Sequence, residues 1–434
     1  MGRRHGQIVE RRIKYDALAS QRRFHQSKAR FKGFSGPVGS GKSLALCHEA
    51  IRLTYLDAGR TGLIGAPTYP MLRDSTLSTY LSICEENALP FEFNKATNTL
   101  VMKDTGSKVL FRSLDEHERL RGTNLAWFGV DEMTYTTEDS WTRLEGRLRD
   151  PLAERLCGFG AWTPKGFDWV YRRFRSDPVK GYELIEAEPY ENRYLLEKVP
   201  DFYERLKASY DERFFQQEAL GKYLNLASGR AYYAFDRQAN TGTYTIDQRE
   251  PLIWSWDFNL SPMCSVICQE IGEDVIVADE IVMETSSTPE VCAEFLARYG
   301  QHRGGVEVYG DASGGHGQTA TGQSDYHLIR EFFRRNPELR GKVHVSRANP
   351  PVRDRINLTN ARILNAQGER HLRIDKRCKE LIKDLEQVCY KPGTGQIDKE
   401  KDRRRTHLSD ALGYYLWWRH RPAPPAGEQN RRLM

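Results

Sequence analysis

Long apolar runs and paired cysteines are missing from this sequence of 434 residues. No stretch of about 18 apolar residues occurs, which is the length that a membrane-spanning helix needs. The N-terminus is polar and basic and lacks the apolar segment of a signal peptide. The eight cysteines are scattered, and the closest pair, Cys264 and Cys268, does not have the C-x-x-C spacing of a zinc ribbon or redox site. We therefore expect reduced thiols in the cytoplasm and no membrane span.

A strong charge of one sign is also absent. The 65 lysines and arginines are nearly balanced by 59 aspartates and glutamates, which gives a net charge of +6. Such a balance does not by itself indicate a nucleic-acid-binding protein. Arginines are nevertheless clustered, and the densest cluster, residues 401–405, lies shortly before Asp410. Runs of this kind are as often solvated faces as phosphate-binding surfaces, but the place of this run before Asp410 favours phosphate contacts by Arg403, Arg404 and Arg405.

Residues 36–43 form a complete phosphate-binding loop of the pattern G-x-x-x-x-G-K-S. Glycines in this loop let backbone N–H groups converge on phosphates, Lys42 would reach the β and γ oxygens, and the Ser43 hydroxyl would ligate Mg²⁺. The run 31–35 before the loop is a predicted strand, and 44–50 continues as a helix, which is the context that the motif requires. The loop therefore predicts binding of a nucleoside triphosphate. Its candidate binding residues are Gly36, Gly39, Ser40, Gly41, Lys42 and Ser43.

An acidic pair follows the apolar run 125–130, which is typical of a buried parallel strand. Asp131 would hold Mg²⁺ through its water shell, and Glu132 would polarise the attacking water. The alternative is an acidic pair that caps the next helix. Because a phosphate loop lies upstream, we favour a Walker B pair and hence triphosphate hydrolysis.

Three further aspartates stand at element ends in the second half of the chain. Asp257 ends the predicted strand 253–256, Asp311 ends the strand 305–310, and Asp410 begins an amphipathic helix. Each could simply end a strand, form a turn or cap a helix. Together they form an RNase H-like arrangement, in which oxygen ligands suit two Mg²⁺ or Mn²⁺ ions about 4 Å apart. His407, three positions before Asp410, could contact this site or DNA, or be an ordinary surface histidine.

The domain organisation predicted from these motifs is of the α/β class throughout. We expect an N-terminal P-loop NTPase domain with a mostly parallel sheet in residues 1–225, because 434 residues exceed what one hydrophobic core usually serves. The polar texture of residues 226–245 predicts a linker. A mixed α/β, RNase H-like nuclease domain would then occupy residues 246–420, and the proline-rich residues 421–434 would form a disordered basic tail.

The combination of a Walker-type ATPase and an RNase H-like nuclease resembles the large terminase subunit of tailed bacteriophages, the motor that cuts and packages viral DNA. Gln21 is similar to the adenine-contacting glutamine of that family. Thr163 looks like the coupling motif that senses the γ-phosphate, and residues 214–223 resemble the segment that closes the ATPase domain. The three nuclease acids of the family are matched by Asp257, Asp311 and Asp410.

The resemblance implies that ATP hydrolysis drives double-stranded DNA into a procapsid and that a two-metal nuclease cuts concatemeric DNA. It implies ATP and Mg²⁺ at the first site, and two Mg²⁺ or Mn²⁺ ions at the second. The implied partners are double-stranded DNA, the portal protein of the procapsid, the small terminase subunit and further copies of the chain in a ring, all in the bacterial host cytoplasm. A repair or recombination translocase or helicase with a fused RNase H-like nuclease is the alternative.

One departure from the family pattern concerns arginine. Many members carry an arginine inside the phosphate loop, whereas residues 37–40 contain none. Charge on the transferring phosphoryl group then needs another donor, because this step is catalysed mainly by electrostatic positioning. The candidates are Arg73, Arg119 and Arg121, acting within one chain or between subunits. We take Arg73 as the first choice.

Overall fold

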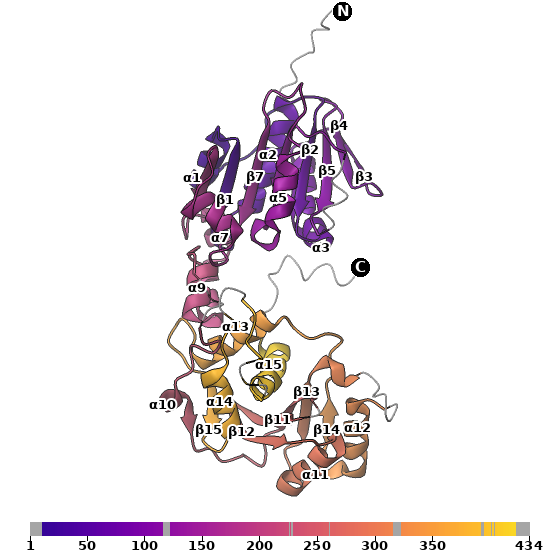
Figure 1. Ribbon diagram of the computed structural model, residues 1–434, viewed down its shortest axis with the longest axis vertical. Coiled ribbons are helices and arrows are strands. Elements are labelled where there is room, and N and C mark those ends of the chain that lie inside the picture. The colour runs from indigo at the N-terminus through magenta and orange to yellow at the C-terminus, as the bar shows by residue number, and fades with distance from the viewer. Residues whose placement is uncertain are drawn as a thin grey trace, which may run out of the picture. The chain divides into compact units, whose positions relative to one another are not determined.

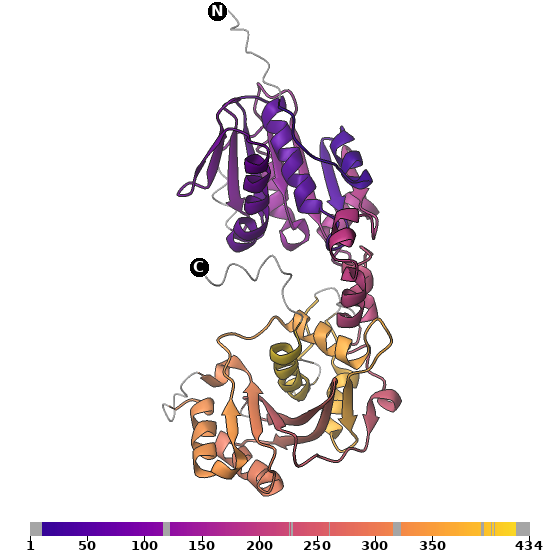
Figure 2. The same ribbon diagram turned by 180° about the vertical axis from the view of Figure 1, so that it is seen from behind.

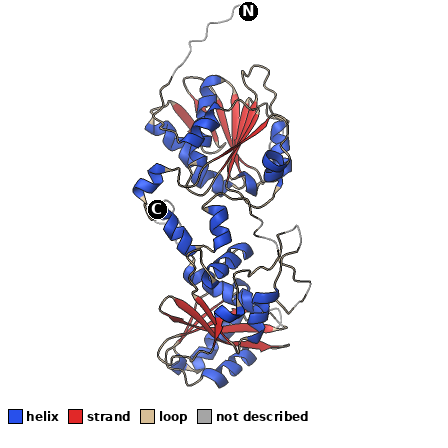
Figure 3. Cartoon of the chain, turned by 90° about the vertical axis from the view of Figure 1, so that its left-hand side faces the viewer, coloured by secondary structure: helices blue, strands red, loops and turns tan. Residues whose placement is uncertain are grey.

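The computed structural model describes residues 11–115, 122–224, 226, 229–259, 261–315, 323–391, 395–400, 402 and 404–421. The chain divides into two compact units, one with residues 1–203 and 216–225 and the other with residues 204–215 and 226–434. Each unit has its own sheet with helices on both faces (Figures 1 and 3). The predicted α/β class is confirmed. Within the described ranges, no helix has both the length and the apolar character that a bilayer span requires.

The first unit is built on an eight-stranded sheet in the order β3-β4-β5-β2-β6-β7-β1-β8. All neighbours in the run β5-β2-β6-β7-β1-β8 pair in parallel. β4 pairs antiparallel with β5 and with β3, which forms the edge of the sheet. The strands are β1 (Phe31–Ser35), β2 (Thr61–Ala66), β3 (Phe91–Asn94), β4 (Thr99–Met102), β5 (Lys108–Ser113), β6 (Trp127–Val130), β7 (Cys157–Trp162) and β8 (Tyr182–Glu186).

Helices cover both faces of this sheet, because its central strands are buried on both sides. α2 crosses one face and α5 the other (Figures 1 and 2). The helices are α1 (Ala19–Gln26), α2 (Lys42–Leu56), α3 (Tyr69–Met71), α4 (Ser78–Glu86), α5 (Glu138–Glu145), α6 (Trp169–Tyr171) and α7 (Arg193–Lys198). Two further helices, α8 (Phe202–Ser209) and α9 (Glu212–Glu218), contain residues of both units. Short π or 3₁₀ turns are η1 (Leu72–Leu77), η3 (Met133–Tyr135) and η4 (Arg172–Ser176).

A buried ion pair holds β1 against α2 on either side of the phosphate loop. Lys32 Nζ lies 2.8 Å from Glu49 Oε1, and both side chains are almost fully buried. Glu49 also pairs with His25 and Arg52. Buried charges are tolerated only with such partners, so this cluster fixes the strand and the helix between which the loop must turn.

The second unit has a seven-stranded mixed sheet in the order β14-β13-β10-β11-β12-β15-β9. β10, β11 and β12 are antiparallel neighbours, whereas β13 pairs in parallel with β10 and with β14. The strands are β9 (Thr241–Gly242), β10 (Leu252–Asp257), β11 (Met263–Ile271), β12 (Asp274–Met283), β13 (Val306–Gly310), β14 (Gly341–Val343) and β15 (Leu372–Asp375).

Two apolar cores lie on the two faces of this second sheet. One core includes α11 and α12, and the other includes α13, α14 and α15 (Figures 1 and 2). The helices are α10 (Arg237–Asn240), α11 (Thr288–Tyr299), α12 (Asp325–Arg335), α13 (Val352–Ile363), α14 (Lys379–Gln387) and α15 (His407–His420), with 3₁₀ turns η5 (Ala312–Gly315) and η6 (Pro337–Leu339).

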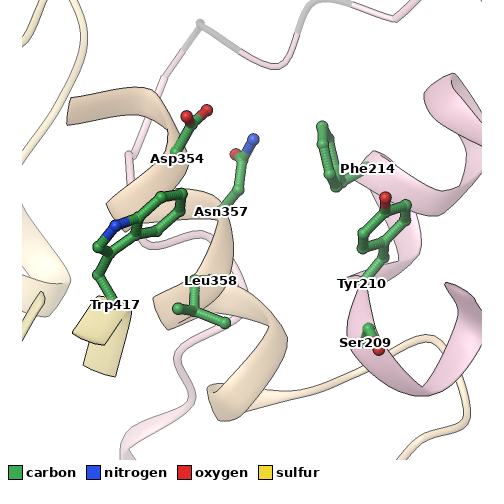
Figure 4. Close-up of a pocket in the computed structure, with 7 residues that line it drawn as sticks. All are labelled: Ser209, Tyr210, Phe214, Asp354, Asn357, Leu358 and Trp417. Carbon is green, nitrogen blue, oxygen red and sulfur yellow. The ribbon is translucent and has the colours of Figure 1, made fainter. Parts of the chain in front are cut away.

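Residues 204–215 pack on the second unit although the flanking chain belongs to the first. The Tyr210 carbonyl accepts a hydrogen bond from the Ala366 N–H at 2.8 Å. In Figure 4, Tyr210 and Phe214 lie across a small cavity from Leu358 of α13 and Trp417 of α15. The cavity measures about 80 Å³. This segment is therefore a structural part of the second unit.

The predicted linker, residues 226–245, is not a linker. Ala231, Tyr232 and Phe235 are buried in the core of the second unit, and β9 pairs with β15 at the sheet edge. The polar run 236–244 suggested an exposed connection, but its aromatic neighbours anchor the segment. The predicted tail, residues 421–434, lies outside the described residues except for Arg421.

This packing predicts the stability of fragments. A fragment that begins at residue 245 lacks Tyr232 and Phe235, whose burial contributes about 3–6 kcal/mol together. We expect a fragment of residues 245–434 to unfold at clearly lower urea concentration than residues 226–434. Equal urea midpoints for the two fragments would show that residues 226–244 do not stabilise this unit.

Candidate active sites

The phosphate loop connects β1 to α2, as the motif predicts. Gly39 and Gly41 adopt φ angles of +77° and +78°, a region that side-chain-bearing residues rarely occupy. Lys42 begins α2, and its Nζ donates to the Pro37 carbonyl at 2.7 Å. Burial lowers the pKa of Lys42. The loop thus places a buried amine beside a ring of backbone groups at a helix N-terminus, which is an anion-binding geometry.

The predicted Walker A and Walker B residues meet in the structure. Ser43 Oγ donates to Asp131 Oδ1 at 3.1 Å across 88 positions of sequence. Thr76 Oγ1, from η1, donates to the other oxygen, Asp131 Oδ2, at 2.8 Å. Asp131 is only 2% exposed, and burial raises its pKa. A hydroxyl and a carboxylate that meet in this way are the pair that would hold a magnesium ion.

Glu132 has an unusual backbone conformation. Its φ of +49° lies in the left-handed region, which costs free energy for a residue with a side chain. Burial, together with the adjacent Asp131 charge, raises the pKa of Glu132. A strained, half-buried carboxylate at a strand end is a feature of catalytic sites, and it favours the catalytic interpretation over a simple helix cap.

Thr163 lies between the two Walker elements, because β7 separates β1 from β6 in the sheet. It follows β7 directly and is 5% exposed. Its carbonyl accepts a hydrogen bond from Thr134 Oγ1 at 3.3 Å, which connects it to the turn that follows Glu132. This position, one strand from each motif, suits a residue that responds to the state of the bound phosphates.

Gln21 uses its amide within the chain. Nε2 donates to the Gly41 carbonyl at 3.0 Å, and Oε1 accepts from the Leu18 N–H at 2.9 Å. Asn192 Nδ2 similarly donates to the Gly39 carbonyl at 2.6 Å. Both amides therefore fix the phosphate loop. The sequence indicated Gln21 through a family resemblance, whereas no motif identified Asn192.

Three hydrogen bonds join the phosphate loop and the neighbouring strands β1 and β7 to residues 218–223. The Val38 N–H donates to the Glu218 carbonyl at 2.8 Å. Tyr223 OH donates to Ser35 Oγ at 3.0 Å and accepts from Trp162 Nε1 at 3.1 Å. Tyr223 thus contacts Ser35, just before the phosphate loop, and Trp162, just before Thr163. These contacts support the prediction that residues 214–223 form the segment that closes the ATPase domain.

The three aspartates of the second unit gather at one edge of its sheet. Because β10 and β13 pair in parallel with Trp256 opposite Gly310, Asp257 and Asp311 leave neighbouring strands at the same end. Asp410 stands in the first turn of α15, which packs on β10 through the hydrogen bond from Ser255 Oγ to the Ala411 carbonyl, 2.6 Å long. The charges of Asp410 and Asp311 both act on Asp257.

Each of these carboxylates has protein partners. Asp257 Oδ2 accepts a hydrogen bond from Asn259 and lies 2.9 Å from His407 Nδ1, and burial raises the pKa of Asp257. Asp311 Oδ1 accepts from the Ser313 N–H at 2.6 Å and from Asn349 Nδ2 at 2.8 Å. Burial would raise the pKa of Asp311, but these hydrogen bonds outweigh it and the pKa is lowered. Asp410 is paired with cations, namely Arg355 at 3.0 Å and Lys399 at 3.5 Å.

The donor chemistry of this site fits Mg²⁺ or Mn²⁺, since three carboxylates supply hard oxygen ligands. Within the described ranges, however, no three His, Cys, Asp or Glu side chains are close enough to form a metal-binding group as they stand. Arg355, Lys399 and His407 contact the carboxylates instead. The residues are thus suited to a metal, with Asp410 held by protein cations.

Among known proteins, the chain is similar to large terminases of bacteriophages. Residues 28–229 match the family of phage terminase large subunits. The predicted resemblance to large terminases is confirmed. One solved large terminase, from a thermophilic bacteriophage, is similar over 93% of this chain and 99% of its own, with a TM-score of 0.67 and 16% identity. A structure of the same terminase in complex with ATP-γ-S is similar over 92% of this chain and 98% of its own, with a TM-score of 0.65 and 15% identity. No curated protein sequence matches the chain.

Of the three candidate arginines for contact with the transferring phosphate, only Arg73 lies in the described residues. Arg73 is exposed in η1 and pairs with Asp74 at 2.7 Å. Arg119 and Arg121 lie outside the described residues. Contact of one of these arginines with the transferring phosphate therefore stays a prediction.

One arginine of the basic run before Asp410 is buried in ion pairs and is not free to bind phosphate. Arg405 was a candidate for DNA phosphate contact, but it is 9% exposed and pairs with Glu380, Asp384 and Asp402. Arg405 therefore anchors the start of α15, and its expected DNA contact is wrong. Arg404 remains exposed, and Arg403 lies outside the described residues.

Proposed function

We propose that this chain is the large subunit of a viral DNA-packaging terminase, in which the first unit hydrolyses ATP to move double-stranded DNA into a procapsid and the second unit cuts concatemeric DNA. The single observation that carries the proposal is the contact between Ser43 and Asp131, with Glu132 adjacent. This contact assembles the parts of a triphosphate-hydrolysing site from segments far apart in sequence.

In the ATPase reaction, the chain's own groups position the phosphates and the attacking water. Lys42 exchanges its contact with the Pro37 carbonyl for the β and γ oxygens, while loop N–H groups from Gly39 to Ser43 hold the phosphate chain. Ser43 and Asp131 would hold the Mg²⁺ of MgATP, which neutralises charge on the phosphates. Glu132 would accept a hydrogen bond from the attacking water, and Thr163, which follows the strand between the two motifs, would respond to loss of the γ-phosphate.

In the nuclease reaction, Asp257, Asp311 and Asp410 would hold one or two Mg²⁺ or Mn²⁺ ions, which supply a hydroxide nucleophile and stabilise the leaving oxygen. His407 and Asn259 orient the Asp257 carboxylate. Asn349 and the Ser313 N–H orient that of Asp311. These neutral donors and the histidine keep the acids in place while a phosphodiester approaches.

The partners follow from the same proposal. Double-stranded DNA is gripped through its phosphates with little base readout, because a packaging motor must move any sequence. Portal protein, small terminase subunit and further copies of the chain in a ring complete the assembly, in the cytoplasm of the bacterial host. The similar large terminase from the thermophilic bacteriophage has been solved in complex with ATP-γ-S, which supports ATP as the nucleotide of the corresponding site here.

The experiment that tests this function measures ATP hydrolysis with and without linear duplex DNA, beside strand separation of a partly duplex substrate. We expect duplex DNA to stimulate hydrolysis without separating its strands. Rapid ATP-dependent strand separation would instead favour the repair or recombination helicase. Absence of ATP hydrolysis under all conditions would refute the proposed motor.

Arg73 is our candidate for the missing phosphate-loop arginine. If Arg73 acts between subunits, Arg73→Ala should leave nucleotide affinity nearly unchanged and slow hydrolysis in the assembled motor by about 10³-fold. The matched control is Arg143→Ala, a half-exposed arginine that also pairs with a nearby acid, Asp139. Mixing Arg73→Ala with Glu132→Gln subunits should restore some hydrolysis at mixed interfaces. No rescue at any ratio would assign the role to another arginine or to the same subunit.

A further inference from the structure

Arg355 is a buried cation beside the nuclease acids. It stands on α13 with an exposed fraction of 5%. Its Nη1 donates to Asp410 Oδ1 at 3.0 Å and to the Asp410 carbonyl at 3.3 Å. No sequence motif identified this residue, since it lies 55 positions before Asp410 on another helix.

The rest of the guanidinium is enclosed by protein. Its carbon lies 4.3 Å from the ring centre of Tyr414, one turn after Asp410 on α15. Arg355 Nε is buried and has no hydrogen-bond partner among the described residues. Because burial of an arginine is costly without a paired charge, its position depends on Asp410. A group so enclosed is poorly placed to bind a DNA phosphate directly.

Asp410 is also the acid that differs most from its neighbours. Asp311 is held by neutral donors from Asn349, Ser313 and Tyr414. Asp410 has a permanent cation on each oxygen, because Lys399 Nζ lies 3.5 Å from Oδ2. The two cations are unequal, since the side chain of Lys399 is 62% exposed and that of Arg355 only 6%. Lys399 is therefore solvated at Asp410, whereas Arg355 is held inside the protein.

We propose that Arg355 is a built-in counter-ion that competes with divalent metal for Asp410 and so sets the metal concentration at which the nuclease site fills. This inference rests on the proposed nuclease function. A guanidinium and a divalent cation that share one carboxylate repel each other in a partly buried site. Arg355 therefore stabilises the cluster of acids without metal and weakens metal binding. The cutting site would fill only where divalent cation is abundant or where bound DNA phosphate adds negative charge.

The test measures Mn²⁺ affinity of the full chain by isothermal titration calorimetry, taken as the part of binding that Asp257→Asn removes. Arg355→Met removes the charge and keeps an apolar stem against Tyr414, and we expect it to bind Mn²⁺ about 10- to 100-fold more tightly than wild type. Arg355→Lys keeps the charge and should stay near wild type. Arg353→Met, which removes an arginine from the same helix, should change nothing.

Thermal unfolding gives a second readout. Without metal, Arg355→Met should melt at a lower temperature than wild type, because the cluster of nuclease acids loses a counter-ion. Added Mn²⁺ should raise the melting temperature of Arg355→Met more than that of wild type. Unchanged or weaker Mn²⁺ binding by folded Arg355→Met would overturn the inference and make Arg355 a simple positioning residue. If Arg355→Met does not fold, Arg355→Gln is judged by the same criterion. Absence of Asp257-dependent Mn²⁺ binding in every variant would instead refute the proposed nuclease site itself.

Discussion

Glu132→Gln should bind ATP with nearly unchanged affinity and hydrolyse it about 10⁴-fold more slowly than wild type, at the upper end of what a positioned general base contributes. The amide keeps the size and burial of the side chain but accepts the water proton poorly. Binding survives because Ser43, Asp131 and Lys42 are untouched. A fluorescent ATP analogue measures binding, and phosphate release measures hydrolysis.

Lys42→Ala should give the opposite phenotype. Its buried amine is the cation of the loop, so its loss should weaken triphosphate binding first. Glu85→Gln, at an exposed site on α4, is a matched control for charge loss and should behave as wild type. If Glu132→Gln hydrolyses ATP at the wild-type rate, the assignment of the catalytic carboxylate is wrong.

Asp257→Asn, Asp311→Asn and Asp410→Asn should each reduce DNA cleavage to background, a loss of at least about 10⁴-fold, with ATP hydrolysis largely unchanged. Carboxylates that share metal ions fail together, so double variants should add almost nothing. Removal of divalent cations by chelation should give the same loss. Agarose gels of supercoiled plasmid with Mn²⁺ measure the cleavage.

Asp274→Asn is the control for this series, because Asp274 begins β12 and pairs with His371 away from the strand ends that carry the acids. It should cut normally. If Asp410→Asn also cuts normally while Asp257→Asn and Asp311→Asn are inactive, the third ligand must be sought elsewhere. Glu280 is then a poor choice, since its carboxylate accepts the N–H groups of Glu380 and Leu381 at the start of α14.

Sequence motifs predicted the strand-end residues well, and the physical reason is geometric. Parallel strands in register bring the residues after their C-terminal ends to one edge, so Asp257 and Asp311 could be placed together from strand order alone. Likewise, the phosphate loop and the Walker B pair come together because both follow central strands of one sheet.

Residues that support these motifs from other elements could not be predicted. Thr76, Asn192 and Arg355 reach their sites through tertiary packing, and nothing in their local sequence indicates a partner 55 or more positions away. The prediction of a linker in residues 226–245 was wrong for a related reason. The polar residues 236–244 indicated an exposed segment, although the preceding Tyr232 and Phe235 are buried in the core of the second unit. Arg405 lies in a basic run that indicates solvent or DNA, yet three acids from its surroundings enclose it.

We propose that one chain carries two chemically independent sites, an ATPase and a nuclease. A paired assay separates them, in which ATP hydrolysis and plasmid cleavage are followed in the same tubes with ATP, Mg²⁺ and Mn²⁺. Wild type should perform both reactions, Glu132→Gln should lose hydrolysis while its metal-dependent cleavage persists, and Asp257→Asn should lose cleavage while hydrolysis persists. Loss of both reactions in either folded variant, or of neither, would contradict the assignment of two separate sites.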